Sequence, residues 1–222
     1  MKQKHMVYFT IYQTNEVIKM LTKEQYANRL KNACQCVIAA EQELTDIDAK
    51  FGDADHGFTM AKVCNAILAA IADADGNIKE MLDDMAMAVM AINGGSAVPL
   101  WNTWLDGMQE GAPETEEIDA AGIQAVFARA FEELDEMSGA KVGDKTMMDA
   151  LIPASEAIAT YTGEDEAELF RLAAEAAAAG AENSKNFPSK FGRAKSYGAK
   201  TIGTPDAGAM SMARFFKGLA QE

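Results

Sequence analysis

The segment Asp48-Ala-Lys-Phe-Gly52-Asp53-Ala-Asp55-His-Gly57 joins two stretches of helical apolar periodicity and places three carboxylates within ten residues. Asp48, Asp53 and Asp55 are separated by five and two positions, and glycines flank the close pair. Hard cations prefer oxygen ligands, and Mg²⁺ is usually held by a few carboxylates together with substrate phosphates. The segment therefore predicts a divalent-metal site in a turn between two packed helices. Taken alone, it is equally consistent with a structural Ca²⁺ site.

Helical patterns continue on both sides of this turn. The run 22–46 begins with Thr22 as a candidate N-cap, and the run 58–72 repeats the same apolar spacing. Further helices are expected at 78–92, from Pro99 to before Gly111, from Thr115 to about Met137, from Asp144 to about Tyr161, from Gly163 to about Glu182, and from Ala207 to Leu219. No segment shows the sustained alternation that is typical of strands. The fold class expected is all-α, with about eight helices.

Length and composition indicate a single domain. The chain has 222 residues and a mass of 23.8 kDa, without a compositional break. Residues 1–21 are expected to form an N-terminal extension, and residues 22–222 the domain. No apolar run approaches the roughly 20 residues of a membrane span, and the run 7–11 is too short for a signal-peptide core. We expect no membrane association.

Charge and cysteine content narrow the function classes. A net charge of −14 and a pI near 4.6 disfavour nucleic acid as a partner, because its binding depends on Lys and Arg contacts. Cys34, Cys36 and Cys64 are odd in number, so reduced thiols in the cytoplasm are expected. Only His5 and His56 are available for histidine chemistry, and His56 adjoins the acidic turn.

Two patterns have plain structural explanations. The segment 73–77 resembles part of a calcium loop but lacks its remaining ligands and closing Glu, so an interhelix turn is the preferred interpretation. The methionines of the 78–92 run, which are Met81, Met85, Met87 and Met90, are expected to fill the core rather than bind a ligand.

Two connections have chemistry that suits an anion. The segment 183–203 contains five Lys or Arg residues and no Asp or Glu, although the chain is acidic elsewhere. Gly94-Gly95 precedes a helix and would let backbone N–H groups approach an anion at the positive end of the helix dipole. Each signal alone is as compatible with an ordinary surface connection.

The order of the helices brings these signals together. In an up-and-down bundle, alternate connections lie at the same end. The connections 48–59, 93–98, 138–147 and 190–208 alternate in this way, so they are expected to meet. Carboxylates, a glycine-rich helix start and a basic loop at one end of a bundle predict a metal-bound polyphosphate site.

Five motifs in this order resemble a known family, the nucleotide-binding L subunit (DhaL) of dihydroxyacetone kinase. The resemblance extends from about residue 22 to the C-terminus. It is carried by Gly52-Asp-Ala-Asp-His-Gly57, Gly94-Gly95 with Pro99-Leu100, Gly143-Asp-Lys-Thr-Met147, Gly192-Arg-Ala194, and Ile202-Gly203 with Asp206-Ala-Gly-Ala209.

The resemblance implies an eight-helix antiparallel up-and-down bundle, or barrel, with a nucleotide–metal site at one end. ADP or ATP would bind through two Mg²⁺ ions, whose ligands would be Asp48, Asp53 and Asp55. The family pattern assigns nucleotide contacts to His56, Gly57, Phe58, Thr59, Gly95, Ser96, Ala97, Ser138, Met147, Arg193, Asp206, Ala207 and Gly208.

By the same resemblance, the chain would be a phosphotransferase subunit that acts on dihydroxyacetone or a related short ketose. The ketose would be held by a separate K subunit (DhaK-like), through a histidine that this chain lacks. The phosphate would be derived from phosphoenolpyruvate through a phosphocarrier subunit (DhaM-like), with ATP as the alternative donor. A homodimer is a further expectation.

One loop departs from the family pattern. Where the family reads Gly-Gly-Ala-Ser-Gly-Pro-Leu, this chain has Ala97 in place of the serine and Val98 in place of the third glycine. Val98 does not readily adopt the positive φ that glycine tolerates, so phosphate geometry is expected to differ. Asp206-Ala207-Gly208 replaces an Asp-Pro-Gly turn, which is a milder change. The alternative function is therefore a non-catalytic, regulatory Mg-nucleotide module.

Overall fold

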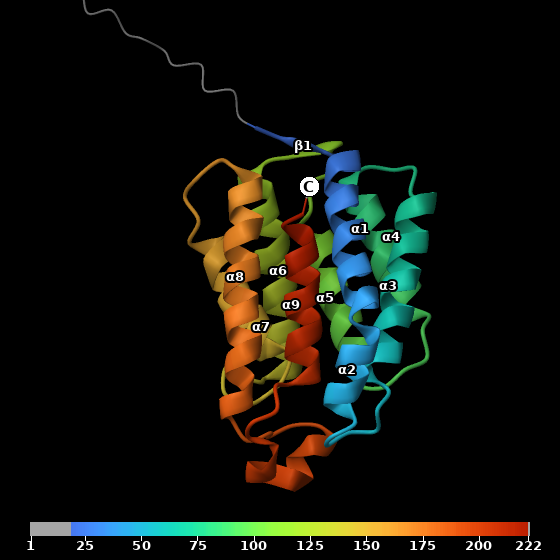
Figure 1. Ribbon diagram of the computed structural model, residues 1–222. Helices are drawn as coiled ribbons and strands as arrows, with labels where there is room; N and C mark the ends of the chain where they lie inside the picture. The colour runs from blue at the N-terminus through green and yellow to red at the C-terminus, as the bar shows by residue number, and fades with distance from the viewer. Residues whose placement is uncertain (1–18, 222) are drawn as a thin grey trace, which may run out of the picture.

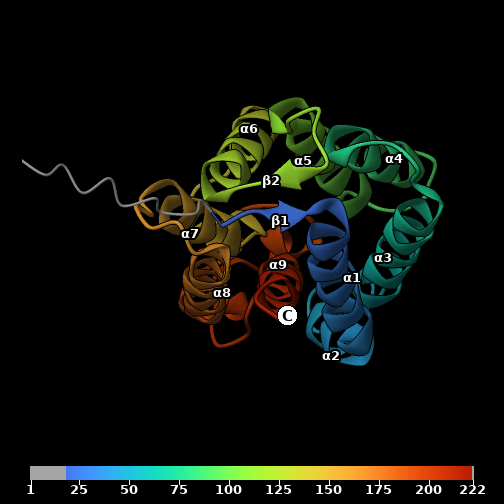
Figure 2. The same cartoon turned by 90° about the horizontal axis from the view of Figure 1, so that it is seen from above.

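The helices of the computed structural model, which describes residues 19–221, follow one another around a closed ring (Figures 1 and 2). Each long helix packs on the next, and the last packs on the first. The helices are α1 Lys23–Ala39, α2 Glu41–Asp48, α3 His56–Asp73, α4 Ile78–Met90, α5 Ala97–Gly111, α6 Ala120–Ser138, α7 Met148–Ala159, α8 Glu166–Asn183 and α9 Ala207–Leu219. With α1 and α2 counted together, this is the expected all-α barrel of eight helical segments.

Several helix boundaries differ from the predictions. The run 22–46 is not one helix, because it breaks at Ala40 and continues as α2. Helix α2 packs against α3 and α9. Helix α6 begins after Asp119, which caps it by accepting from the Gly122 N–H at 2.7 Å, and not at Thr115. Helix α8 likewise begins after Asp165 rather than at Gly163. At the starts of α6 and α8, a carboxylate nearer the apolar run provides the N-terminal cap.

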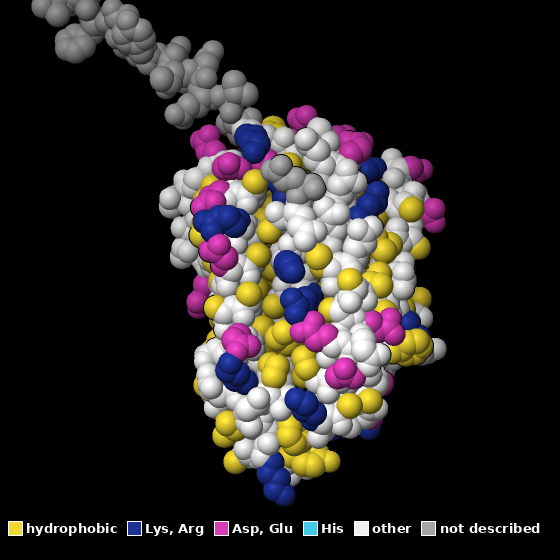
Figure 3. Space-filling model, viewed as in Figure 1, with side chains coloured by type: hydrophobic (Ala, Val, Ile, Leu, Met, Phe, Trp, Pro, Cys, Tyr) yellow, Lys and Arg dark blue, Asp and Glu magenta, His cyan; other side chains and the backbone are white. Residues whose placement is uncertain are grey.

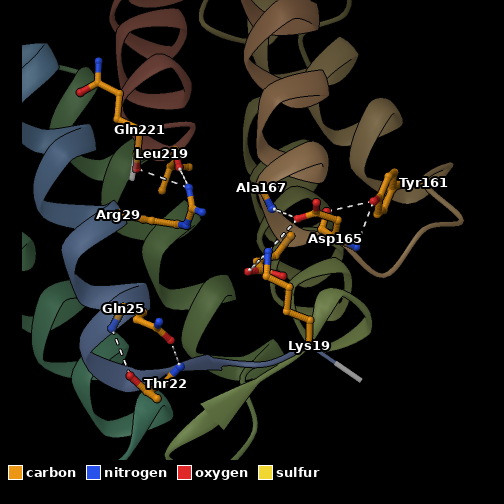
Figure 4. A network of polar contacts seen from close by, with 10 residues as sticks. Lys19, Thr22, Gln25, Arg29, Tyr161, Asp165, Ala167, Leu219 and Gln221 are labelled. Atoms are coloured by element: carbon orange, nitrogen blue, oxygen red, sulfur yellow. Dashed lines mark hydrogen bonds and ion pairs between the residues drawn. The ribbon is translucent and has the colours of Figure 1, made fainter. Parts of the chain in front are cut away.

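The region around Thr115 forms a strand, contrary to the expectation of no strands. β1 (Leu21–Thr22) pairs antiparallel with β2 (Glu117–Ile118), so that Leu21 lies opposite Ile118. Of the predicted N-terminal extension, residues 1–18 lie outside the described part. Leu21 is only 4% exposed and belongs to the domain. Figure 4 shows Lys19 beside Asp165, with an Nζ–Oδ1 distance of 3.1 Å.

The structure also tests the predictions for the 73–77 segment and for the methionines of α4. The 73–77 segment is the α3–α4 turn, where Asn77 and Glu80 form a capping box at the start of α4. Met81 and Met85 are buried as predicted, whereas Met87 and Met90 are 56% and 60% exposed and do not fill the core. The three cysteines are free thiols.

The barrel interior is filled by aromatic side chains from α5, α6 and α9. Trp104 packs on Trp101, Phe127, Phe215 and Phe216 with ring centroids 5.4–6.2 Å apart. The ring closes where α9 meets α1. There a Cβ at Gly218 would lie 2.3 Å from Ala33 Cα, so only glycine permits this approach.

Alternate connections meet at one end of the barrel, at the bottom of Figure 1. This end carries the α2–α3, α4–α5, α6–α7 and α8–α9 connections. The last of these includes the 3₁₀ segments η1 (Ser184–Asn186) and η2 (Arg193–Thr201). β1 and the end of α9 lie at the opposite end (Figure 1). Within residues 19–221, no helix has the length and apolarity required to cross a membrane.

Candidate functional site

A cavity of about 430 Å³ opens at the end of the barrel where the four connections meet. It is bordered by residues from all four connections and from the first turns of α3, α5 and α9. Fourteen of the sixteen predicted site residues line it: Asp48, Asp53, Asp55, His56, Thr59, Gly95, Ser96, Ala97, Ser138, Met147, Arg193, Asp206, Ala207 and Gly208. The four connections therefore meet as predicted, whereas the binding roles of these residues remain predictions.

Two predicted residues do not border the cavity. Gly57 is buried beneath it, and a Cβ there would lie 2.0 Å from the Glu41 carbonyl oxygen, so this glycine lets α3 approach α2. Phe58 is 54% exposed, and its ring lies 4.3 Å from Lys62 Nζ. A contact from either residue to a bound nucleotide remains a prediction.

The connection between α2 and α3, called here the acidic turn, brings the carboxylates of Asp48, Asp53 and Asp55 close together. One oxygen from each of Asp48, Asp53 and Asp55 lies within 4.8 Å of the others. The turn is held by the Asp55 N–H, which donates to Asp48 Oδ2 at 3.2 Å, and by Ala54, whose φ of 60° reverses the chain between the close pair. A Cβ at Gly52 would lie 2.0 Å from Asp48 Oδ1, so any other residue here would displace this carboxylate.

The electrostatics of this turn suit a cation. Burial, together with the charges of Asp53 and Asp48, raises the pKa of Asp55 above its usual range. Mutual repulsion of three carboxylates is relieved when a divalent cation lies among them. An oxygen-only ligand set of this kind fits Mg²⁺ or Ca²⁺.

The basic connection reaches across the cavity to the acidic turn. Arg193 Nη2 lies 2.7 Å from Asp53 Oδ2, and 72% of the Arg193 side chain is exposed. The Tyr197 ring packs on Phe51 with centroids 5.3 Å apart. These contacts place the forked guanidinium at the edge of the carboxylate cluster.

His56 lies at the inner wall, in the first turn of α3. Its Nε2 is 3.2 Å from Ser211 Oγ, which donates its own proton to the Gly208 carbonyl at 2.8 Å. Burial lowers the pKa of His56, although Asp48 and the Ala207 backbone act in the opposite direction. The imidazole is therefore neutral near pH 7 and ties α3 to the first turn of α9.

The altered glycine loop is accommodated without strain. Val98 has an ordinary helical conformation in the first turn of α5, since the positive-φ non-glycine residues described are Ala54 and Lys145. Its side chain is 5% exposed and covers Gly94, where a Cβ would meet Val98 Cγ2 at 2.4 Å. Val98 therefore requires no positive φ, so the predicted conflict with its backbone conformation does not arise. An effect on phosphate geometry stays a prediction. Only Ala97 of the two departures borders the cavity.

The Gly143–Met147 turn contains a residue that the sequence did not mark as functional. Lys145 also borders the cavity, yet it is 5% exposed and has a φ of 64°. Asp144, predicted as a helix cap, does not cap α7. Asp149 holds the turn instead, by accepting from the Gly143 and Thr146 N–H groups at 2.7 and 2.8 Å. The sequence signal for this role is the position of Asp149 three residues after Thr146, from which its carboxylate reaches the Thr146 N–H.

Asp206 caps α9 at the floor of the cavity. Its Oδ2 accepts from the Ala209 N–H at 2.8 Å, and its own N–H donates to Ser184 Oγ at 2.8 Å. Burial raises the pKa of Asp206 to about 7, and Asp149 contributes to this, while the Ala209 N–H and Lys145 oppose it.

This raised pKa predicts a pH-dependent stability. Between the unfolded-state pKa of about 4 and the folded-state value, the folded chain binds more protons, so this group's contribution to stability falls as pH rises through that range. Asn also caps helices but does not ionise. Asp206→Asn should therefore raise the free energy of unfolding at pH 8 by about 1–3 kcal/mol and leave it nearly unchanged at pH 4. Urea unfolding at both pH values measures this, and an equal effect at both would contradict the prediction.

The chain matches a known family over most of its length. The family model described as the DAK2 domain matches residues 50–221. The D-erythrulose kinase of Mycolicibacterium smegmatis is 35% identical over 179 residues, which are 78% of this chain and 31% of that protein. The chain therefore spans about a third of the length of that relative.

A second relative corresponds to the chain over nearly its whole length. The ADP-binding subunit DhaL of the PEP-dependent dihydroxyacetone kinase of Escherichia coli is 28% identical over 198 residues, which are 86% of this chain and 93% of that subunit. A solved dihydroxyacetone kinase from C. freundii, in complex with AMP-PNP and Mg²⁺, has the same fold over 99% of this chain and 38% of its own, with a TM-score of 0.66 and 21% identity. The family match and the shared all-helical barrel agree with the resemblance of the five motifs, and the chain belongs to the DAK2-domain family.

Proposed function

We propose that the cavity binds ADP or ATP with Mg²⁺, and that the chain is the nucleotide-binding subunit of a kinase acting on dihydroxyacetone or a related short ketose. One observation carries the proposal. Three carboxylates, an exposed guanidinium and the N-terminal turns of α3 and α5 come together around one cavity from three separate connections. Mg-polyphosphate requires this combination of metal ligands and anion-binding groups.

In this proposal, Asp48, Asp53 and Asp55 hold two Mg²⁺ ions. When bound, these ions neutralise charge on the phosphate oxygens, which phosphoryl transfer needs more than covalent assistance. The backbone N–H groups at the starts of α3 and α5 face the phosphates with the positive ends of the helix dipoles. Arg193 provides a forked donor to a phosphate oxygen.

Apolar residues of the cavity lining are suited to the base. Met147, Leu100 and Phe191 border the cavity and offer apolar surface. An adenine ring stacks and buries well on such a surface. Asp206, Ala207 and Gly208 also border the cavity and are proposed to contact the nucleotide.

A separate K subunit is proposed to supply the ketose. Relatives are named D-erythrulose kinase and PEP-dependent dihydroxyacetone kinase subunit, which are phosphotransferases acting on short ketoses. Exposed apolar side chains at the cavity end support docking of a partner chain, since large exposed apolar side chains mark interaction surfaces. Apolar side chains are visible among basic ones at the bottom of Figure 3. This end carries Phe58, Met90, Met137, Val142, Phe191, Tyr197 and Ile202, each at least 42% exposed.

The phosphate donor and the setting are also proposals. The names of the DhaL relatives support phosphoenolpyruvate as the phosphate source, and the phosphate would reach the bound nucleotide through a phosphocarrier subunit. The three free cysteines agree with a cytoplasmic location. A homodimer stays a prediction.

Calorimetry with purified protein tests the nucleotide site. MgADP and MgATP should bind with micromolar or tighter dissociation constants, and chelation of the metal by EDTA should weaken ADP binding by at least about tenfold, because the phosphates then face uncompensated carboxylates. Absence of MgADP and MgATP binding would exclude the kinase function.

The second candidate is a regulatory Mg-nucleotide module without turnover. Ala97 favours it, because this residue borders the cavity without the hydroxyl found in the family pattern. Turnover distinguishes the two functions. A K-type partner chain mixed with this chain and either ATP or a phosphocarrier should phosphorylate dihydroxyacetone if the first proposal holds. Nucleotide binding without turnover with any such partner would favour the second.

A further inference from the structure

Lys145 has no donor left for a ligand, although it borders the cavity. Its Nζ donates to the carbonyl oxygens of Ser184 at 2.9 Å and Phe187 at 3.2 Å, and also to that of Thr204. A lysine ammonium has three N–H donors, and three acceptors use all of them. Lys145 therefore cannot act on a bound phosphate as a direct hydrogen-bond donor while these contacts persist.

The three acceptors lie at the two ends of one connection. Ser184 and Phe187 begin the segment between α8 and α9, and Thr204 ends it. The same ends are joined by the Gly203 N–H, which donates to the Lys185 carbonyl at 2.7 Å. Lys145 thus closes a loop, residues 184–206, whose middle part lies over the cavity.

A second clamp comes from the neighbouring residue of the same turn. Lys190 Nζ lies 2.6 Å from Asp144 Oδ1, and the Lys190 N–H donates to the Asp144 carbonyl at 3.1 Å. The Lys190 contact and the Lys141 N–H lower the pKa of Asp144, so this carboxylate is charged at neutral pH. Between this clamp and Thr204 lies the span that carries Arg193.

The cost of burying Lys145 is partly offset by nearby carboxylates. Burial lowers the pKa of Lys145, whereas Asp206 and Asp149 raise it. The positive φ of Lys145 is a further conformational cost, which a glycine at this position would not incur. A buried charge in a strained backbone persists only where the surroundings require it.

We propose that Lys145 is a positioning residue of the nucleotide site, holding both ends of the 184–206 loop so that Arg193 stands at the acidic turn. That the ligand is a nucleotide rests on the proposed function. The contacts between Lys145 and the loop are present without a ligand and do not depend on that function.

Hydrogen exchange tests the clamp without a nucleotide. Lys145→Met keeps the length of the side chain and removes all three donors. In the full chain, the amides of Ser189, Lys190 and Gly203 should exchange at least about tenfold faster, while core amides of α5 and α9 keep their protection, because only the loop loses its fastening. Unchanged exchange in the loop would overturn the proposal.

A double-mutant cycle tests whether Lys145 acts through Arg193. Arg193→Gln and Lys145→Met should each weaken MgADP binding by about tenfold, the range for loss of one charge-assisted contact. With Lys145→Met already present, Arg193→Gln should cost less than about threefold, because the guanidinium no longer stands at the site. If the fold-changes in MgADP affinity of the two substitutions simply multiply, Lys145 either contacts the nucleotide directly or acts through general stability. Either result would overturn the proposal.

A surface variant keeps the test decisive if Lys145→Met does not fold. Lys190→Met removes only the outer clamp, at a side chain that is 57% exposed, and should give a smaller change of the same kind in both measurements. No change in loop exchange and full additivity with Arg193→Gln would count against the proposal. If the wild-type chain binds no MgADP, the proposed function fails, whereas the exchange experiment still decides the clamp.

Discussion

Asp53→Asn is expected to weaken MgADP binding by about a hundredfold. The substitution keeps the shape of the side chain and removes one of three negative charges that meet at a single point. Cation affinity depends on the number of charged oxygen ligands, and changes even to residues that only support metal ligands cost about 10–100-fold. Titration calorimetry with MgADP gives the change directly.

Two comparisons isolate the metal contribution. Asp84→Asn removes the same charge from an exposed position on α4 that does not border the cavity. It should leave the affinity unchanged within about twofold, because exposed charges are screened by salt and solvent. In EDTA, both chains should bind ADP weakly, and the Asp53→Asn chain should bind at least as tightly as the wild type, because it presents one carboxylate fewer to the phosphates. An Asp53→Asn chain that binds MgADP as tightly as the wild type would remove Asp53 from the set of metal ligands.

Gly218→Ala is expected to lower the free energy of unfolding by about 3 kcal/mol, near the upper end for overpacking. The added methyl would lie 2.3 Å from Ala33 Cα and 2.4 Å from the Asn32 carbonyl oxygen, so it meets backbone that cannot rotate away. Helices α1 and α9 must separate, which opens the contact that closes the ring. Thermal unfolding should show a melting temperature lower by roughly 10 °C.

A matched glycine substitution provides the control. Gly95→Ala places a methyl where no atom lies within 4 Å, at a glycine without positive φ, and should change the free energy of unfolding by less than about 0.5 kcal/mol. Equal destabilisation by both substitutions would show that loss of glycine, rather than the α1–α9 contact, is responsible.

Much of the fold follows from local patterns. The helical spacing of apolar residues identifies each long helix. The order of the helices then identifies which connections lie together, since successive connections of an antiparallel barrel lie at opposite ends. The boundaries follow less well. Thr115 and Asp119 are both acceptable caps, and only the pairing of Glu117–Ile118 with Leu21–Thr22 decides between them. That pairing joins segments far apart in sequence, so no local pattern contains it.

The site shows the same division. Asp48, Asp53 and Asp55 are close in sequence, and their grouping follows from spacing alone. Lys145 is a different case, because a lysine in a polar turn suggests solvent exposure, whereas its burial depends on carbonyl groups 39 to 59 residues away. Val98 also required the structure, since whether the residue needs a positive φ depends on where α5 begins.

Both described chain ends, at residues 19 and 221, lie at the end of the barrel opposite the cavity (Figure 1). Helix α9 has 13 residues and therefore a length of about 20 Å. A linker leaving from the C-terminal end, after residue 221, needs roughly six or more extended residues before anything attached to it reaches the cavity mouth. Shorter tethers at this end, including those used to fix the protein to a surface, should leave ligand entry unobstructed.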